Sequence, residues 1–403
     1  MTRGALLVGQ SGGATAVINA TLAGVVESAL DTGAFSRVLG MRNGIEGLLR
    51  NDLIDLGTQK PATITALRHT PSAALGTTRR KVTDADLDPI LARLREHDVR
   101  GVVYIGGNDS ADTAHRLHQA AKAAGYELSV ISAPKTVDND LPHTDHCPGY
   151  PSAARFLANV VRDATYDTLA APSLYPIKFI EVMGRDAGWL AAATALGFGD
   201  TERDLAPLIF FPERAPESAE QALAEVVQQV EERGWCVAIV PETLRDAGER
   251  HLSGAEPLYT DPHGHEYYPS PAETLTMLAI RETPYHRARY ERPGSAARMS
   301  TLLASPVDRQ EAYDLGWAAA ARAAAGQSDI MVTLDRLSDE PYQCALGVAP
   351  LAEIANQARP FPDGFIAPGG RAPSESYRAY ALPLLGPDPF PVYARLDPAP
   401  AGR

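Results

Sequence analysis

Short, continuous apolar runs recur along this chain, and each is closed by glycine, proline or polar residues. The runs are Ala5–Val8, Val102–Ile105, Leu128–Ala133, Ile177–Met183 and Cys236–Val240. Alanine- and leucine-rich stretches with helical periodicity separate them. Strands that are apolar throughout are typical of parallel sheets buried between two layers of helices. The alternation therefore predicts an α/β protein with mostly parallel sheets, whose ligands collect at the carboxyl ends of the strands.

The chain is too long for one ordinary domain. It has 403 residues, of which 45% are hydrophobic, so we expect two α/β domains with buried cores. Its formal net charge is −13, which disfavours nonspecific binding to nucleic acid or to anionic membranes. We expect neither as a partner, and an anionic small substrate would need a local basic pocket.

The cysteines indicate a reducing compartment. Cys147, Cys236 and Cys344 are far apart and in no CxxC arrangement, which disfavours both a disulfide framework and a thiolate zinc site. The N-terminus runs directly into the strand-like Ala5–Val8 without a signal-peptide pattern, and no 18-residue apolar span follows. We therefore expect a cytoplasmic protein.

The first motif that carries chemistry lies at Gly9–Asn19, where a strand ends in the glycine pair Gly12 and Gly13 and we expect a helix to begin at about Ala14. Backbone N–H groups at such a helix N-terminus bind anions. A plain tight connection gives the same pattern, so the turn alone does not establish a phosphate site. The chain has no GxxxxGK[ST] motif, which excludes a P-loop.

A second turn of this kind, Gly106–Ser110, follows the strand Val102–Ile105. It offers Gly107, Asn108, Asp109 and Ser110 as candidate donor-binding residues. Helix capping by one of the polar side chains is the alternative reading. Two phosphate-competent turns in neighbouring units indicate a polyphosphate ligand.

The third motif, Pro134–Asp140, has the sequence PKTVDND and follows the strand Leu128–Ala133. Asp138 and Asp140 are two residues apart, so in an extended loop they point the same way. One can deprotonate a hydroxyl while the other orients it or binds a metal. Lys135 adds a positive charge for a phosphoryl group in transfer. An Asx-rich turn is the structural alternative.

Together these motifs resemble those of the 6-phosphofructokinases. SGG, GGNDS and PKTVDND are followed by EVMGRDAGW at Glu181–Trp189 and by VPE at Val240–Glu242, in the order and spacing of that family. The resemblance covers most of Leu6–Gly326. It implies the phosphofructokinase fold, with two Rossmann-like three-layer domains.

The resemblance also implies a division of the chain. Residues 1–141, joined by a returning segment at about 300–358, would bind the phosphoryl donor. Residues 142–299 would bind the sugar phosphate. Residues 359–403 are rich in proline, and we expect an extension with little regular structure. A homodimer or homotetramer is implied, with a neighbouring subunit completing the sugar site.

Residue roles follow from the same resemblance. Asp138 would be the base that activates the sugar hydroxyl, and Lys135 and Arg79 would stabilise charge on the transferring group. The residues implied to bind the acceptor are Thr136, Asp140, Met183, Gly184, Arg185, Glu242, Arg289 and Arg298. Gly12, Gly13, Gly107, Asn108, Asp109 and Ser110 would bind the donor.

Two positions favour pyrophosphate over ATP as the donor. Relatives that use ATP resemble GGDGS and PGTIDND, whereas this chain has Asp109 and Lys135. A carboxylate at 109 occupies the space that an α-phosphate and nucleoside would need, and its charge repels the phosphate. Asn108 stands where the family commonly has an aspartate for magnesium, so we expect Mg²⁺ at Asn108 and Asp109, with help from Asp138 and the pyrophosphate oxygens. ATP remains the alternative donor.

The acceptor is less well defined. Arg289 and Arg298 match the clamp that the family uses for the phosphate of fructose 6-phosphate, but Pro176, Ser295 and Ala297 depart from it. Side chains that could refill the pocket are His286, Arg287 and Arg292. Fructose 6-phosphate is the expected acceptor, and another sugar, a cyclitol or another metabolite is the alternative. A catalytically silent ligand sensor or assembly subunit is a further alternative.

Asp261–His265 contains a histidine pair. We expect a polar loop there instead of a metal site, because no third ligand is nearby in the sequence. The polar stretch Glu249–Ala272, which contains it, is expected to form an excursion beside the second domain.

Overall fold

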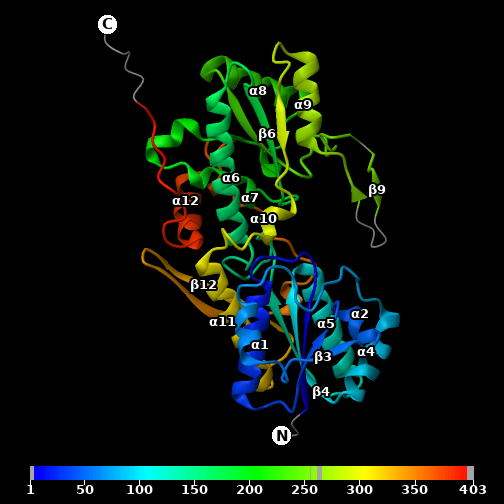
Figure 1. Ribbon diagram of the computed structural model, residues 1–403. Helices are drawn as coiled ribbons and strands as arrows, with labels where there is room; N and C mark the ends of the chain where they lie inside the picture. Colours follow the sequence, from blue (N-terminus) through cyan, green and yellow to red (C-terminus); the bar gives the residue numbers. More distant parts are fainter. Residues whose placement is uncertain (1–3, 255, 261–265, 397–403) are drawn as a thin grey trace.

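The computed structural model describes residues 4–254, 256–260 and 266–396, which form two α/β bodies in contact with each other (Figure 1). The segment 261–265, where a polar loop was expected, lies outside the described residues. No helix in the described ranges is both long and apolar enough to cross a bilayer.

The first body is built on a seven-stranded sheet with the order β13-β12-β5-β4-β1-β2-β3. The strands are β1 (Ala5–Gln10), β2 (Val38–Met41), β3 (Leu53–Asp55), β4 (Val99–Gly106), β5 (Ser129–Pro134), β12 (Ile330–Asp339) and β13 (Tyr342–Pro350). The five central strands are parallel, and the edge strands β3 and β13 are antiparallel to their neighbours.

Helices cover both faces of this sheet, because its strands are apolar on both sides. Leu6 and Val8 pack with α1 (Ile18–Thr32) and α11 (Pro306–Ala324). Leu7, between them, packs on the opposite face. The helices of that face are α2 (Ile45–Leu49), α4 (Asp84–Glu96) and α5 (Asn108–Ala123), and α3 (Pro61–Leu67) lies beside α1.

The crossing of α1 and α11 depends on two glycines. A Cβ on Gly24 would lie 2.1 Å from the carbonyl oxygen of Tyr313, and a Cβ on Gly316 would lie 2.0 Å from that of Thr21. The helices therefore touch backbone to backbone. This contact joins the N-terminal part of the sheet to the segment that returns after the second body.

The second body contains a fully parallel four-stranded sheet with the order β11-β6-β8-β7. Its strands are β6 (Ile177–Val182), β7 (Leu208–Ile209), β8 (Cys236–Pro241) and β11 (Arg289–Glu291). One face packs on α6 (Tyr150–Ala170) and α7 (Trp189–Ala193), and the other packs on α8 (Ala219–Arg233) and α9 (Pro271–Glu282). The predicted α/β class with mostly parallel sheets is confirmed.

Short elements complete the described chain. The hairpin of β9 (Tyr259–Thr260) and β10 (Glu266–Tyr267) projects from the second body, and α10 (Ser295–Met299) lies between the bodies in Figure 1. The 3-10 helices are η1 (Thr194–Gly197), η2 (Asp200–Leu205), η3 (Pro212–Arg214), η4 (Leu351–Glu353), η5 (Asp363–Phe365) and η6 (Leu382–Leu385).

The C-terminal part of the chain is more regular than its proline content indicates. It contains η5, η6 and the helix α12 (Glu375–Ala381). Its aromatic side chains surround Trp189: the ring of Phe361 lies 5.0 Å from that of Trp189, and the ring of Tyr380 lies 5.6 Å away. Burial of these rings holds the segment against α6 and α7, so the prediction of little regular structure is wrong for 363–385.

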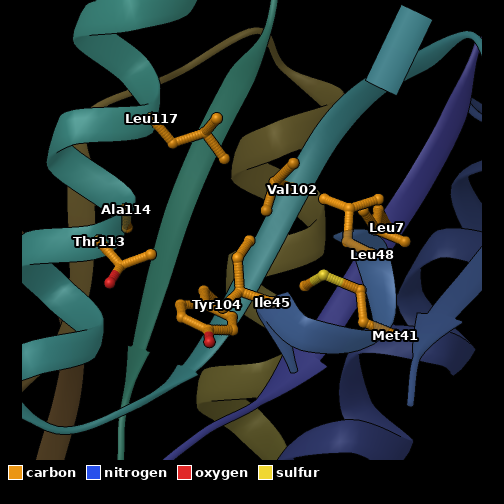
Figure 2. Close-up of a pocket in the computed structure, with 9 residues that line it drawn as sticks. All are labelled: Leu7, Met41, Ile45, Leu48, Val102, Tyr104, Thr113, Ala114 and Leu117. Atoms are coloured by element: carbon orange, nitrogen blue, oxygen red, sulfur yellow. The ribbon is translucent and has the colours of Figure 1, made fainter. Parts of the chain in front are cut away.

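A small cavity of about 10 Å³ lies inside the first body (Figure 2). Its lining is almost wholly apolar and comes from the sheet, α2 and α5: Leu7, Met41, Ile45, Leu48, Val102, Tyr104, Thr113, Ala114 and Leu117. A void of this size holds about one water molecule at most. It is a packing defect of the core and offers no room for a substrate.

Candidate active site

The candidate site lies where the carboxyl ends of the two parallel sheets face each other. In the first sheet, Gly106 pairs with Pro134, so the turns after β4 and β5 are neighbours. In the second sheet, Val182 pairs with Pro241, so the turns after β6 and β8 are neighbours too. The sequence motifs follow these strand ends, as expected for a parallel sheet.

The glycine turn after β1 does not form a helix N-terminus, contrary to the prediction. The helix α1 begins at Ile18 instead of about Ala14. A bend at residues 16 and 17 precedes it, and Thr15 Oγ1 accepts a hydrogen bond there from the backbone N of Val17 at 3.3 Å. The positive end of the α1 dipole therefore does not lie at the glycine pair.

Gly12 is held in a left-handed conformation, with φ of +76°. Its N–H donates to the carbonyl oxygen of Thr78 at 2.9 Å, and its carbonyl accepts from Thr77 Oγ1 at 2.6 Å. The N–H of Gly12 is thus not available to a phosphate. A Cβ placed on Gly13 would have no neighbouring atom within 4 Å, so this glycine borders open space. Space for an anion remains beside Gly13.

The turn after β4 has mainly structural contacts. Gly107 precedes α5, and the side-chain amide of Asn108 accepts from the backbone N of Asn356 at 2.6 Å and donates to the carbonyl of Gln357. Ser110 is buried beneath Gly106. The Asn108 side chain is therefore bound to the polypeptide.

Asp109 is exposed and forms an ion pair with Lys81, with Nζ and Oδ1 3.2 Å apart. Sequence reasoning did not identify Lys81. The pair places both a positive and a negative charge at the start of α5 and at the rim of the site.

Lys135 is 3% exposed and lies beside the glycine turn, where a Cβ on Gly12 would be 3.0 Å from Nζ. The pKa of Lys135 is lowered to about 8; burial is the main cause and Arg298 and Arg79 add to it, while Asp138 and Asp140 oppose the shift. At neutral pH most molecules carry the charged form. A desolvated cation at this point is suited to an anionic ligand.

Asp138 is half-buried, and its pKa is raised to about 6. Burial is the main cause and the carboxylate of Asp140 adds to it, while Arg185 and Lys135 oppose it. The group is ionised above pH 6 and is a stronger base than an ordinary aspartate. The opposing effect of Arg185 also shows that the turn after β6 faces the turn after β5.

The turn after β6 is strained. Gly184 has φ of +124° and Arg185, which is not a glycine, has φ of +46°. Left-handed backbone is unfavourable for such a residue and is often found at functional sites. Met183 is half-buried at the start of the turn, and Arg185 is exposed.

Glu242 follows β8, and its N–H donates to Val182 at 2.9 Å. Burial, and then the charge of Asp138, raise the pKa of Glu242 to about 7, while Arg185 opposes the shift. A carboxyl group that is half protonated near neutral pH can both donate and accept hydrogen bonds. That property suits recognition of a hydroxyl-rich ligand.

A buried group that sequence reasoning missed lies next to Glu242. Glu181 is 5% exposed, and it accepts a hydrogen bond from Arg292 Nε at 2.8 Å and another from Ser270 Oγ. Glu181 is the first residue of EVMGRDAGW, so its place in the motif was a usable signal. Arg292 was only a secondary candidate.

The three predicted arginines outside these turns differ in position. Arg298 donates to the carbonyl of Ala14 at 2.7 Å and is close enough to lower the pKa of Lys135, so it lies at the site. Arg79 is exposed at the same rim, with Nη1 3.4 Å from the hydroxyl of Tyr267.

Arg289 is not brought to the site within one chain. It pairs in register with Lys178, near the start of β6, and its guanidinium lies 3.4 Å from the ring centre of Tyr175. Tyr175 precedes β6, so this end of the sheet is opposite the end that carries Met183 and Arg185.

An open cavity of about 290 Å³ adjoins the turns after β6 and β8. It is lined by Asp186, Pro212, Ala215, Thr243, Arg245, Asp246 and Glu249. Three carboxylates against one arginine disfavour a phosphate there. The basic side chains Lys135 and Arg298 are not among its lining residues.

No group of three or more histidine, cysteine, aspartate or glutamate side chains suited to a metal ion is found among the described residues. Asp138 and Asp140 are close enough that the charge of Asp140 raises the pKa of Asp138. Neither carboxylate accepts a hydrogen bond from the described part of the chain. They therefore fit a divalent cation whose remaining ligands come from a substrate.

The family model described as Phosphofructokinase matches residues 5–323. The pyrophosphate–fructose 6-phosphate 1-phosphotransferase of Xanthomonas campestris pv. campestris is 41% identical over 98% of this chain and 97% of that protein. The sulfofructose kinase of Alkalicoccus urumqiensis is 33% identical over 89% of this chain and 91% of that protein.

A crystal structure of pyrophosphate-dependent phosphofructokinase from Nitrosospira multiformis superposes with a TM-score of 0.86 at 34% identity, and covers 98% of this chain and 95% of that one. The similarity therefore extends past the matched family region into the C-terminal segment.

Proposed function

The chain belongs to the phosphofructokinase family, and from this we propose that it transfers a phosphoryl group from pyrophosphate to the 1-hydroxyl of fructose 6-phosphate. One observation carries the proposal: buried Lys135 and the basic carboxylate of Asp138 lie together between a glycine turn and Arg185. This arrangement provides a base, a charge for the donor and a cation facing the acceptor. The name of the Xanthomonas relative agrees with it.

In the proposed reaction, Asp138 takes the proton of the acceptor hydroxyl as its oxygen attacks the nearer phosphorus of pyrophosphate. The bond between that phosphorus and the bridging oxygen breaks, and phosphate leaves with the electron pair. Lys135 and Arg79 offset the charge on the phosphoryl oxygens. Thr136 orients the base, since its Oγ1 accepts from the N–H of Asp138 at 3.1 Å.

The acceptor is expected to lie against Met183, Gly184, Arg185 and Glu242. Arg292 and Arg298 are the nearest cations for its own phosphate, and the contact of Arg292 with Glu181 fixes its direction. Arg289 lies at the far end of its own sheet, so we propose that it acts across a homodimer or homotetramer interface, in the site of a neighbouring copy.

Pyrophosphate as the donor is supported by the start of α5. The backbone of Asn356 and Gln357 lies on Asn108, and the Asp109–Lys81 pair stands beside it. These groups occupy space that a nucleoside attached to the phosphates would need. Pyrophosphate is compact enough to lie between Gly13 and Lys135.

Magnesium is the expected cofactor, since it is typical of phosphoryl transfer in this family. Asp140 fits it better than the predicted ligands, because Asn108 is bound to the backbone and Asp109 is paired with Lys81; Asp138 is left to act as the base. When bound, Mg²⁺ offsets the charge of pyrophosphate. We therefore propose Asp140 and the pyrophosphate oxygens as its ligands.

We also propose a cytoplasmic location.

A second acceptor is favoured by a specific observation. The clamp positions Pro176, Ser295 and Ala297 depart from the family pattern, and one relative is named sulfofructose kinase. A sugar that carries a sulfonate instead of a phosphate would keep the chemistry of Asp138 and change only the recognition of the distal anion.

The test is a matrix of donors and acceptors on the purified chain with magnesium. Pyrophosphate and ATP are each combined with fructose 6-phosphate, a 6-sulfo sugar and unphosphorylated fructose, and product is measured by mass spectrometry. Fructose 1,6-bisphosphate formed from pyrophosphate supports the proposal. Its absence, with turnover of another pair, would reject the proposed substrates and retain the family.

A further inference from the structure

The segment that carries the proposed base is fastened by an arginine from the C-terminal part of the chain. We call residues 136–147, which connect β5 to α6, the base segment. The backbone N of Arg359 donates to the carbonyl of Asp140 at 2.6 Å, and its Nη2 donates to the carbonyl of Asn139 at 2.8 Å. Arg359 thus binds the two residues that follow Asp138.

The same side chain also binds the far limb of the base segment. Nη1 of Arg359 donates to the carbonyl oxygens of Thr144 and Asp145, each at 2.8 Å. All of these partners are backbone carbonyls, and only the planar fork of a guanidinium reaches so many at once. Arg359 therefore closes the base segment into a fixed loop.

Arg359 further connects this loop to the acceptor side of the site. Its guanidinium lies 4.6 Å from the ring centre of Trp189. Trp189 ends the motif that begins at Glu181 and includes Arg185. A single side chain therefore contacts the segments that supply the base and the acceptor cation.

A second residue of the C-terminal segment acts on the same loop. The hydroxyl of Tyr380 donates to the carbonyl of Asp145 at 2.9 Å and accepts from Asn139 Nδ2 at 3.2 Å. Asn139 has φ of +56°, a left-handed conformation that asparagine adopts more readily than most residues other than glycine. The contacts of Tyr380 therefore add to those of Arg359 in holding the peptide between Asp138 and Asp140.

We propose that Arg359, assisted by Tyr380, is a positioning residue that holds Asp138 in line with the acceptor hydroxyl. This rests on the proposed function of Asp138. Arg359 lies outside residues 5–323, which match the family model, and it touches no group proposed to react. A displacement of about 1 Å of a catalytic group can lower a rate about 100-fold. The contacts of Arg359 therefore affect turnover more than donor binding.

The test compares Arg359→Met, Arg359→Lys and Tyr380→Phe with a matched control, Arg371→Met. Arg371 belongs to the same C-terminal segment, and its guanidinium also anchors it: it pairs with Glu225 on α8 and donates to the carbonyl of Arg214, which precedes α8. Both arginines are half-buried. The two methionine variants therefore remove comparable anchors at different places.

For Arg359→Met we expect kcat to fall about 10- to 100-fold while KM for pyrophosphate changes less than about threefold. Arg359→Lys is expected to recover part of kcat, since its ammonium reaches one or two of the carbonyls. Tyr380→Phe is expected to lose less than Arg359→Met. Arg371→Met is expected to keep the kcat of the unaltered chain.

Hydrogen exchange provides a readout that needs no activity. Amides of residues 136–147 are expected to exchange faster in Arg359→Met and at the original rate in Arg371→Met. Unchanged kcat and exchange in folded Arg359→Met, or equal losses in Arg371→Met, would overturn the proposal. If Arg359→Met does not fold, Arg359→Lys and Tyr380→Phe decide by the same criteria.

The failure of the proposed function has a different signature. In that case the unaltered chain forms no product from pyrophosphate and fructose 6-phosphate, while faster exchange in Arg359→Met would still show that Arg359 holds the base segment.

Discussion

The ammonium of Lys135 lies so close to the backbone of Gly12 that a methyl group on this glycine would come within 3.0 Å of Nζ. This contact sets the distance between the glycine turn and Lys135, which is deeply buried. Gly12 also needs its left-handed φ of +76°. A substitution of Gly12 would both displace Lys135 and strain the backbone, and these two effects can be measured separately.

Gly12→Ala is expected to lower kcat/KM for pyrophosphate about tenfold, because the methyl group moves Lys135 away from the donor. Strain is expected to cost about 1 kcal/mol of unfolding free energy. Gly33→Ala is the control, since Gly33 has φ of +56° at the end of α1 and nothing within 4 Å of its Cβ. Equal loss of activity in both variants would contradict the role of the contact.

Asp138→Asn is expected to lower kcat by about 10²- to 10⁴-fold, since an amide cannot accept the proton. The same change should stabilise the fold. The pKa of Asp138 is raised to about 6 in the folded state, so folding disfavours the ionised form. The protein therefore loses stability as pH rises from the pKa of this side chain in the unfolded chain to about 6. At pH 8 the free energy of unfolding of the variant, measured with urea, should be higher by about 1 kcal/mol after allowance for the partial exposure of the side chain.

The dependence of kcat/KM on pH should be bell-shaped. Activity is expected to fall below about pH 6 as Asp138 takes up a proton, and to fall above about pH 8 as Lys135 loses one. The pKa of Glu242, about 7, lies between these limits. Measurement of the profile in Glu242→Gln tests the assignment, because the acid limb should remain there if Asp138 causes it.

A buried histidine should make stability depend on pH. Both ring nitrogens of His146 face carboxylates, with Nδ1 2.8 Å from Asp145 and Nε2 2.8 Å from Glu311, and its pKa is raised to about 9. The pKa of His146 is higher in the folded state than in the unfolded state. The protonated ring therefore stabilises the fold fully below about pH 6.5, and this stabilisation is lost as pH rises through 9. Urea unfolding should show a decline of at most about 3 kcal/mol over this range, and His146→Gln should remove it.

Gly316→Ala is expected to destabilise the first body by about 2–3 kcal/mol, because the new methyl group would meet the carbonyl oxygen of Thr21 at 2.0 Å. Backbone atoms cannot move aside as a side chain can, so α1 and α11 must separate. Gly24→Ala should have a similar effect at the same crossing. Denaturant unfolding measures both, and a change below about 0.5 kcal/mol would contradict the close approach.

Much of the fold followed from local sequence patterns. The apolar runs at Ala5–Val8 and Val102–Ile105 became central strands, since residues buried on both faces leave a continuous apolar signature. The motif PKTVDND placed Asp138 and Lys135 correctly after a strand. Local sequence carries this information because strand, turn and side chain are adjacent.

Other features depend on contacts between distant residues and were missed. The ion pair of Lys81 with Asp109 and the contact of Arg292 with Glu181 join segments that no spacing rule connects. Arg359 reaches its partners across more than two hundred residues. The start of α1 was predicted four residues too early, at Ala14 instead of Ile18, because glycines and small residues are compatible with either a bend or a helix.

The returning segment also constrains the order in which the chain can fold during synthesis. The strand β12 pairs with β5, and α11 lies against the glycine face of α1, yet both follow the whole second body in sequence. Until α11 and β12 leave the ribosome, one side of α1 is bare and β5 has an unpaired edge. Such surfaces are prone to wrong pairing, so the nascent N-terminal half should depend on chaperones or on slow translation until its last two strands arrive.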